Sequence, residues 1–182
     1  MDLVDLIAEK RFLGQEFLTW LWWKSEERGG SIHLPEHGDI TLVFEKHMLL
    51  EYGEGESLEK LICTGLQAQL QEARTGLKMG KKLEQARIIL GYKDNEYSFT
   101  LAGALLEFRN VRLPKTASSD NVKEDNPEEI EGMILERLFL LEELSRVTND
   151  LLRLFLETRL SGSWQEELNK IREWVAKASS ES

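Results

Sequence analysis

Six basic side chains lie close together in a chain that is acidic as a whole. They are Arg74, Lys78, Lys81, Lys82, Arg87 and Lys93, and the same stretch holds one acidic residue, Glu84. The formal net charge of the 182-residue chain is −10. Because ammonium and guanidinium groups bind phosphate, this local excess of positive charge predicts an anion-binding surface. An interpretation that the residues support equally well is a solvated helix end, where cations stabilise the negative pole.

The other residues with reactive side chains have simpler explanations than catalysis. His33, His37 and His47 match no metal-ligand spacing, and a zinc site needs three or four converging ligands, so we interpret them as surface loop histidines. Cys63 lies in the apolar run LICTG, which indicates a buried and unreactive thiol. Adjacent glutamates recur at expected helix ends, where solvation explains them. We therefore predict no catalytic residue, no metal site and no cofactor.

A run of tryptophans has two interpretations. Trp20, Trp22 and Trp23 stand beside Lys24, an arrangement that resembles a platform for stacking nucleic-acid bases next to a cation. Aromatic residues on an apolar helix are more often part of a core or an interface. We favour the second interpretation.

Composition limits the class of protein and its location. Apolar residues make up 41% of the chain and charged residues 31%, as in ordinary globular proteins. The pI near 4.9 argues against coating nucleic acid over a whole face but leaves room for a confined basic groove. A single cysteine fits a reducing compartment. No stretch reaches the roughly 18 apolar residues of a membrane span, and Asp2 and Asp5 precede any basic residue, unlike a signal peptide. We expect a cytoplasmic protein.

The elements that must position these residues follow from apolar periodicity and turn residues. We predict one helix over 2–27, in which Gly14 costs about 1 kcal/mol relative to alanine; we attribute it to close approach of another element. Strands are predicted at 40–45, 48–52 and 58–64, a helix at 66–78, and strands at 82–92, 96–102 and 104–111. The first two strands are expected to meet in a turn at Lys46 and His47.

The carboxy-terminal third is predicted to be helical. A polar linker covers 114–128, and Asn126 and Pro127 begin a long helix that reaches Leu160. Ser161 to Ser163 interrupt it before a last helix over 164–178. The predicted fold is α+β: a mostly antiparallel βββ-α-βββ sheet, flanked by an amino-terminal helix and two carboxy-terminal helices, one of them long. We divide the chain into a sheet domain (1–113), the linker (114–128) and a helical segment (129–182) that packs on the sheet or on a partner.

The order of these segments resembles the carboxy-terminal half of the recombination-associated protein RdgC family. The resemblance runs over residues 11–165. It rests on LGQEFLTWLWWKSE, on ITLVFEKHMLLEYGEG, and on a helix followed by Gly80-Lys81, a strand, and a strand that ends in Phe108-Arg109. No catalytic motif is part of it, and the amino-terminal half of the family has no counterpart in this sequence.

The resemblance implies a non-catalytic, nucleoid-associated protein that binds duplex DNA with little sequence preference. Members of the family form ring-shaped dimers around DNA and limit access of the recombinase RecA. Lys81 and Lys82 would then contact phosphates, with Lys78, Arg74 and Arg87 as further contacts. A homodimer, or a partner that supplies the missing half, is implied as well. The alternative is a protein-interaction module that uses the Trp-rich and Leu-rich helices and binds no DNA.

Overall fold

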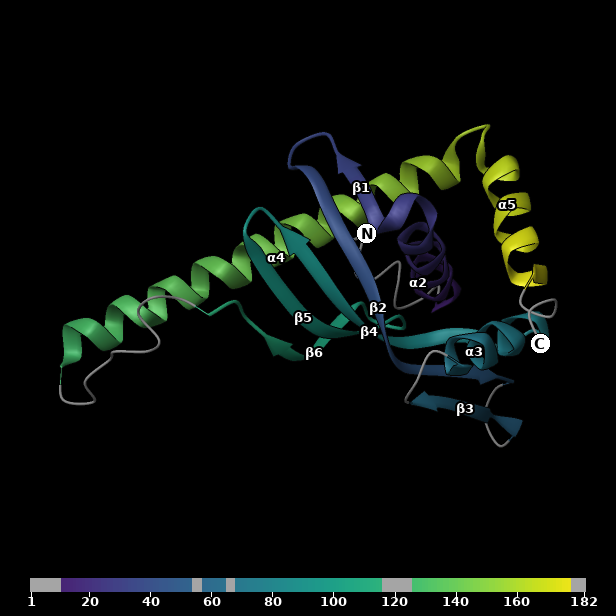
Figure 1. Cartoon of the computed structure of the whole chain (residues 1–182), viewed down its shortest axis with the longest axis horizontal. Helices are drawn as coiled ribbons and strands as arrows, with labels where there is room; N and C mark the ends of the chain where they lie inside the picture. The colour runs from purple at the N-terminus through teal and green to yellow at the C-terminus, as the bar shows by residue number, and fades with distance from the viewer. Residues whose placement is uncertain (1–10, 54–56, 65–67, 116–125, 178–182) are drawn as a thin grey trace.

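The computed structural model describes residues 11–53, 57–64, 68–115 and 126–177 (Figure 1). Its elements are α2 (Arg11–Glu26), the 3-10 turn η1 (Glu27–Gly30), β1 (Ser31–Leu34), β2 (Gly38–Tyr52), β3 (Glu59–Thr64), α3 (Ala68–Lys78), β4 (Lys82–Tyr92), β5 (Asn95–Ala102), β6 (Glu107–Arg112), α4 (Pro127–Leu160) and α5 (Trp164–Ala176). The predicted α+β class and the order βββ-α-βββ are confirmed. Residues 2–10 of the first predicted helix lie outside the described residues.

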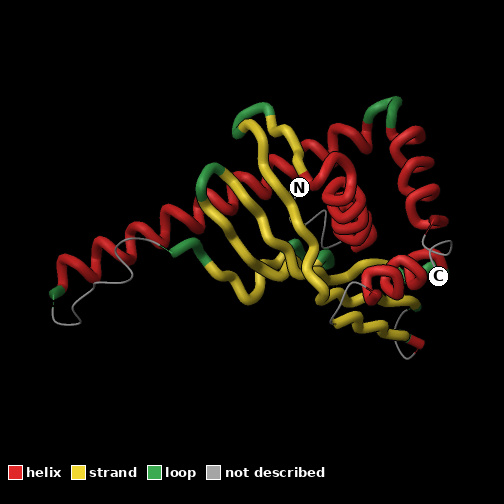
Figure 2. The backbone as a smooth tube through the Cα atoms, in the orientation of Figure 1, coloured by secondary structure: helices red, strands yellow, loops and turns green. Residues whose placement is uncertain are grey.

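A six-stranded antiparallel sheet forms the centre of the molecule (Figure 2). Its order is β1-β2-β4-β5-β6, and β3 also pairs with β2. Both β1 and β3 can pair with β2 because β2 is long. Its first part, Gly38–Thr41, pairs with β1, and its last part, His47–Tyr52, pairs with β3. β4 runs along the other edge of β2. One strand therefore connects two smaller strands to the rest of the sheet.

The predicted turn at Lys46 and His47 is wrong, because 38–52 is one continuous strand. The pairing of β2 with β4 shifts register between Phe44 and Met48, which marks a bulge at the polar residues. A bulge and a turn both interrupt an apolar alternation, so the sequence pattern does not separate them. The first part of β2 forms a hairpin with β1, a strand that the sequence analysis missed. The predicted strand 104–111 begins only at Glu107.

The helices pack on one face of the sheet. Ala86, Ile88 and Leu90 of β4 are buried on that face beneath α2, and α4 in turn packs on α2, where the Phe17 and Phe155 rings lie 5.4 Å apart. The side chains of the tryptophan run, Trp20, Trp22 and Trp23, are at most 6% exposed. They are core residues, as favoured above, and offer no platform for bases.

The long helix α4 has the predicted boundaries. The Asn126 side chain accepts a hydrogen bond from the Glu128 backbone N–H (3.2 Å), and Pro127 occupies the first turn. The helix ends at Leu160, before Ser161. Within the described ranges, no helix combines the length and the apolar character that crossing a membrane requires.

Gly14 lies where α2 crosses the turn between β5 and β6. A Cβ atom built on Gly14 would stand 1.8 Å from the carbonyl oxygen of Gly103. Such a contact is impossible, and the neighbouring atom is backbone, which cannot rotate away. The close approach expected from the sequence is confirmed, and it fixes how near α2 can come to the sheet.

Gly14→Ala should therefore lower the free energy of unfolding by at least about 2 kcal/mol, because the extra methyl group forces α2 off the sheet. The matched control is Gly132→Ala in α4, where a Cβ meets nothing within 4 Å; it should raise stability by up to about 1 kcal/mol through helix propensity. Urea denaturation of both variants measures this difference. Equal stabilities would contradict the packing described for α2.

Candidate functional site

The basic residues predicted to bind DNA do not share one surface. Lys78, Lys81 and Lys82 line a single cavity beside the α3–β4 turn. Arg87 lies on the opposite face of the sheet, because its neighbours Ala86 and Ile88 point toward α2 and strand residues alternate. Arg74 points from α3 toward the end of α2. The structure thus brings the lysines together and separates the arginines from them.

Both arginines make contacts that hold elements together. Arg87 Nε lies 2.5 Å from Glu45 Oε2, and its Nη2 donates to Ser98 Oγ at 2.8 Å, which joins β4 to β2 and β5. Arg74 pairs with Glu26 at 2.5 Å and lies 4.9 Å from the Trp174 ring centroid. Glu26 also accepts a hydrogen bond from Trp174 Nε1 at 2.8 Å. These contacts account for Arg74 and Arg87 without an anionic ligand.

The three lysines differ from one another in exposure. Lys81 Nζ pairs with Glu59 at 3.0 Å, and its side chain is only 15% exposed. Lys78 and Lys82 are exposed at the rim of the cavity. Carboxylates therefore neutralise Arg74, Lys81 and Arg87, and much of the positive charge counted along the sequence is compensated in space.

A cavity lies beside these residues. Its volume is about 550 Å³, and it lies between α2, α5 and the α3–β4 turn. Its lining residues are Phe12, Gln15, Glu16, Thr19, Leu77, Lys78, Lys81, Lys82, Trp164, Leu168, Ile171, Arg172, Val175 and Ala176. Arg172 adds a cation from α5 that the sequence analysis missed, because it stands about ninety residues from the basic stretch.

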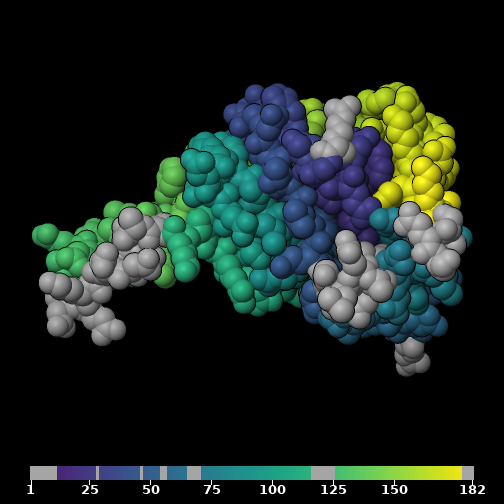
Figure 3. Space-filling model, in the orientation of Figure 1, coloured from purple at the N-terminus to yellow at the C-terminus, as the bar shows by residue number. Residues whose placement is uncertain are grey.

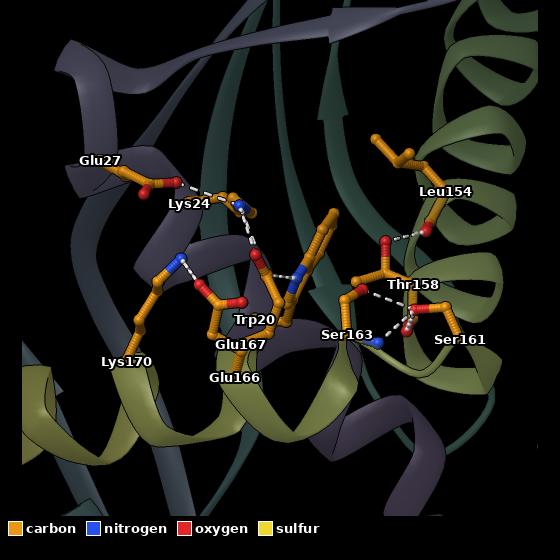
Figure 4. A network of polar contacts seen from close by, with 10 residues as sticks. All are labelled: Trp20, Lys24, Glu27, Leu154, Thr158, Ser161, Ser163, Glu166, Glu167 and Lys170. Atoms are coloured by element: carbon orange, nitrogen blue, oxygen red, sulfur yellow. Dashed lines mark hydrogen bonds and ion pairs between the residues drawn. The ribbon is translucent and has the colours of Figure 1, made fainter.

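A polar network fixes α5 against α2 and so shapes the cavity (Figure 4). Trp20 Nε1 donates to Glu167 at 3.1 Å, and Lys24 Nζ lies 3.4 Å from the same carboxylate and 3.0 Å from Glu27. Lys24, which stands beside the tryptophans in sequence, is therefore part of this network. These contacts fix the position of α5, which forms one side of the cavity, relative to α2.

A second candidate site is the apolar stripe of α4, which we define as Ile134, Leu135, Leu138, Phe139 and Leu141. These side chains are between 40% and 60% exposed. Leu140 in the same stretch, and Leu144, Val147 and Phe155 farther along, are almost completely buried on another face of the helix. The beginning of α4 extends beyond the edge of the sheet (Figure 1), and Figure 3 shows it protruding from the body of the molecule.

The middle of α4 is anchored to the sheet by polar contacts. Tyr97 OH donates to Glu143 at 2.5 Å, and Lys93 Nζ lies 3.1 Å from the same carboxylate. His37 Nε2 lies 2.7 Å from Asp150, so this histidine is a partly buried contact and not the surface loop residue that we expected. Among the described residues, no group of three or more His, Cys, Asp or Glu side chains is arranged to hold a metal ion.

These contacts shift the pKa values of the anchor in opposite directions. Burial, together with the hydrogen bond to Glu143, raises the pKa of Tyr97, which stays protonated as a donor. Burial alone would raise the pKa of Glu143, but the hydrogen bonds from Tyr97 and Lys93 and the charge of Lys93 outweigh it and lower the pKa. Cys63 is buried, and burial raises the pKa of its thiol, as expected of an unreactive cysteine.

Comparison with known proteins identifies no relative. No protein-family model matches the chain, and neither a curated protein nor a solved structure is significantly similar to it. The resemblance to the RdgC family therefore stays a prediction from segment order.

Glu143→Gln should lower the free energy of unfolding by about 1–2 kcal/mol at neutral pH, because the charged acceptor of Tyr97 is lost. The pKa of Glu143 is lowered in the folded protein, so its contribution is complete above the unfolded value of about 4.3 and disappears as the pH falls through the folded value. Denaturation measured from pH 7 to pH 3 should show the free energies of unfolding of wild type and Glu143→Gln becoming equal at low pH.

The control for this measurement is Glu142→Gln. Glu142 is the neighbouring carboxylate, its side chain is 59% exposed, and it pairs with Arg146 on the surface of the same helix. Its substitution should leave stability nearly unchanged. If the free energies of unfolding of wild type and Glu143→Gln differed by the same amount at all pH values, the Glu143 charge would not anchor α4.

Proposed function

We propose that this protein is a non-catalytic protein-interaction module that self-associates through the apolar stripe of α4. The observation that supports this most strongly is that α4 exposes five large apolar side chains on a face other than the one that buries Leu140, Leu144 and Phe155. Contiguous exposed apolar patches on soluble proteins commonly mark interaction sites, since leaving them in water is unfavourable. The Trp-rich helix, which the alternative interpretation also assigned to a partner surface, is buried and is not part of this proposal.

The spacing of the stripe fits a helical partner. Ile134, Leu138 and Leu141 form one row at intervals of four and three residues, and Leu135 and Phe139 form a second row beside it. Two such rows give ridges that interlock with those of another helix. The beginning of α4 projects beyond the edge of the sheet (Figure 1), whereas Phe139 lies near Tyr92 and Lys93 at that edge.

The charges that flank the stripe favour a second copy in antiparallel orientation. Three acidic residues, Glu128, Glu129 and Glu131, precede the stripe, whereas the flank that follows it is mixed: Glu142, Glu143 and Arg146, with Arg146 paired to Glu142. Antiparallel pairing centred between Leu138 and Phe139 places Glu131 of one copy opposite Arg146 of the other. Parallel pairing would bring the acidic residues of both copies together. An interface of this kind uses the same patch on each copy, as two-fold symmetric dimers do.

Leu138→Glu should convert the dimer to a monomer. Each dimer loses the burial of the exposed parts of two leucine side chains, about 1.5–3 kcal/mol, which raises the dissociation constant at least tenfold. Because Leu138 is 54% exposed in the single chain, the variant should stay folded. Light scattering coupled to size-exclusion chromatography measures the change. The control is Leu160→Glu, at the exposed end of the same helix (83% exposed), which should leave the dimer intact.

The orientation has a separate test. Arg146→Glu should weaken the dimer, and Glu131→Arg in the same chain should restore it, because antiparallel pairing exchanges the two charges across the interface. Failure of the second substitution to restore the dimer would contradict the antiparallel arrangement. A wild-type chain that stays monomeric at high concentration would contradict self-association altogether.

DNA binding is the second candidate function, and one observation favours it. Lys78, Lys81, Lys82 and Arg172 converge on one cavity although the protein is acidic. Together with the resemblance to the RdgC family, this supports sequence-independent contacts to phosphates, in a cytoplasmic protein located at the nucleoid. The apolar lining of the cavity and the pairing of Lys81 with Glu59 weigh against it.

Lys81→Glu combined with Lys82→Glu should weaken DNA binding equally for all sequences and flatten its dependence on salt, because fewer counterions are released. Gel-shift titrations with random duplex and single-stranded DNA at two salt concentrations measure both effects. Lys115→Glu, an exposed substitution outside the cavity, is the control. Unchanged affinity and salt dependence in the double variant would remove these lysines from any DNA site.

A further inference from the structure

The cavity between α2, α5 and the α3–β4 turn combines an apolar floor with a cationic rim. Its floor consists of the apolar residues Phe12, Leu77, Trp164, Leu168, Ile171 and Val175. Its volume of about 550 Å³ lies in the range of small-molecule sites, which are mostly apolar with a few polar groups that orient the ligand. This combination differs from a polar phosphate-binding surface.

Basic side chains line the cavity from two directions, and because Glu59 neutralises Lys81, the exposed Lys82 and Arg172 supply the charge that the proposal uses. Lys78, Lys81 and Lys82 come from the end of α3 and the beginning of β4, and Arg172 comes from α5. Glu16 also lines the cavity, but its carboxylate accepts from Arg159 Nε at 2.6 Å. In a chain with a net charge of −10, a cationic rim over an apolar floor selects an anionic ligand with an apolar body.

Contacts at two places fix α5, which forms one wall of the cavity, in position relative to α2. The Trp20–Glu167 hydrogen bond fixes the beginning of α5 to α2. Toward the other end of α5, Glu26 binds both Arg74 and Trp174. Because both ends of α5 are fixed to neighbouring helices, the cavity that α5 lines is part of the folded structure. It does not require α5 to move away from α2.

We propose that this cavity binds an amphiphile with a carboxylate head, of the kind represented by a medium-chain fatty acid. The aliphatic chain lies on the floor formed by α2 and α5, where burial of its CH₂ groups favours binding. The carboxylate lies at the rim beside Lys82 and Arg172, which supply charge-assisted hydrogen bonds. This site is separate from the apolar stripe of α4 and does not depend on self-association.

Titration calorimetry of the full chain with dodecanoate below its micelle concentration tests the proposal. We expect saturable binding of one dodecanoate per chain, much weaker binding of hexanoate, and no binding of dodecyltrimethylammonium, whose head is cationic. Lys82→Glu combined with Arg172→Glu should weaken the binding of dodecanoate at least tenfold, and the control Lys115→Glu should leave it unchanged. Both cavity substitutions lie at exposed positions, so the thermal unfolding midpoint should change little.

A second variant tests the apolar floor. Ala176 lines the cavity at an exposed position of α5, and Ala176→Trp should fill the space and abolish binding without unfolding the protein. Three calorimetric results would overturn the proposal: no saturable dodecanoate binding, equal binding of the cationic amphiphile, or unchanged affinity in the Lys82 and Arg172 double variant. Binding of single-stranded DNA that excludes dodecanoate would assign the cavity to nucleic acid and also overturn it.

Discussion

The burial of α2 between the sheet and the carboxy-terminal helices is the constraint on which the rest of the structure depends. Gly14 lets α2 approach the β5–β6 turn to backbone contact. On its other side, Phe17 and Trp20 pack against Phe155 of α4, with ring centroids 5.4 and 5.6 Å apart. A helix held this tightly determines where α4 and α5 can lie. The cavity and the protruding start of α4 both follow from that position.

Most of the local positive charge serves this architecture. Arg74 connects α3 to α2 and α5, and Arg87 connects three strands on the opposite face. Charge counted along a sequence predicts a surface only when the side chains converge and lack acidic partners. Here the partners Glu26 and Glu45 come from distant parts of the chain, so the compensation cannot be read from the basic stretch itself. What converges is a smaller set of lysines joined by Arg172.

Local sequence patterns predicted the positions of most helices and strands, but they did not predict which residues make contact across the fold. The cap at Asn126, the end of the long helix at Leu160 and the close approach at Gly14 are confirmed because each depends on neighbouring residues or on one special residue type. The bulge in β2 was mistaken for a turn, because both interrupt the same alternation. Arg172 in the cavity and the anchor between Glu143 and Tyr97 depend on contacts across the fold, for which the sequence holds no local signal.

Self-association through the apolar stripe of α4 is the central claim, and sedimentation velocity on the unmodified chain over a wide range of concentration tests it most directly. The account predicts a shift from a single monomeric boundary at high dilution to a dimeric boundary at high concentration. The shift should persist at high salt, because burial of apolar side chains drives it and screening weakens only the flanking charges. A sedimentation coefficient that stays monomeric at every concentration would contradict the account.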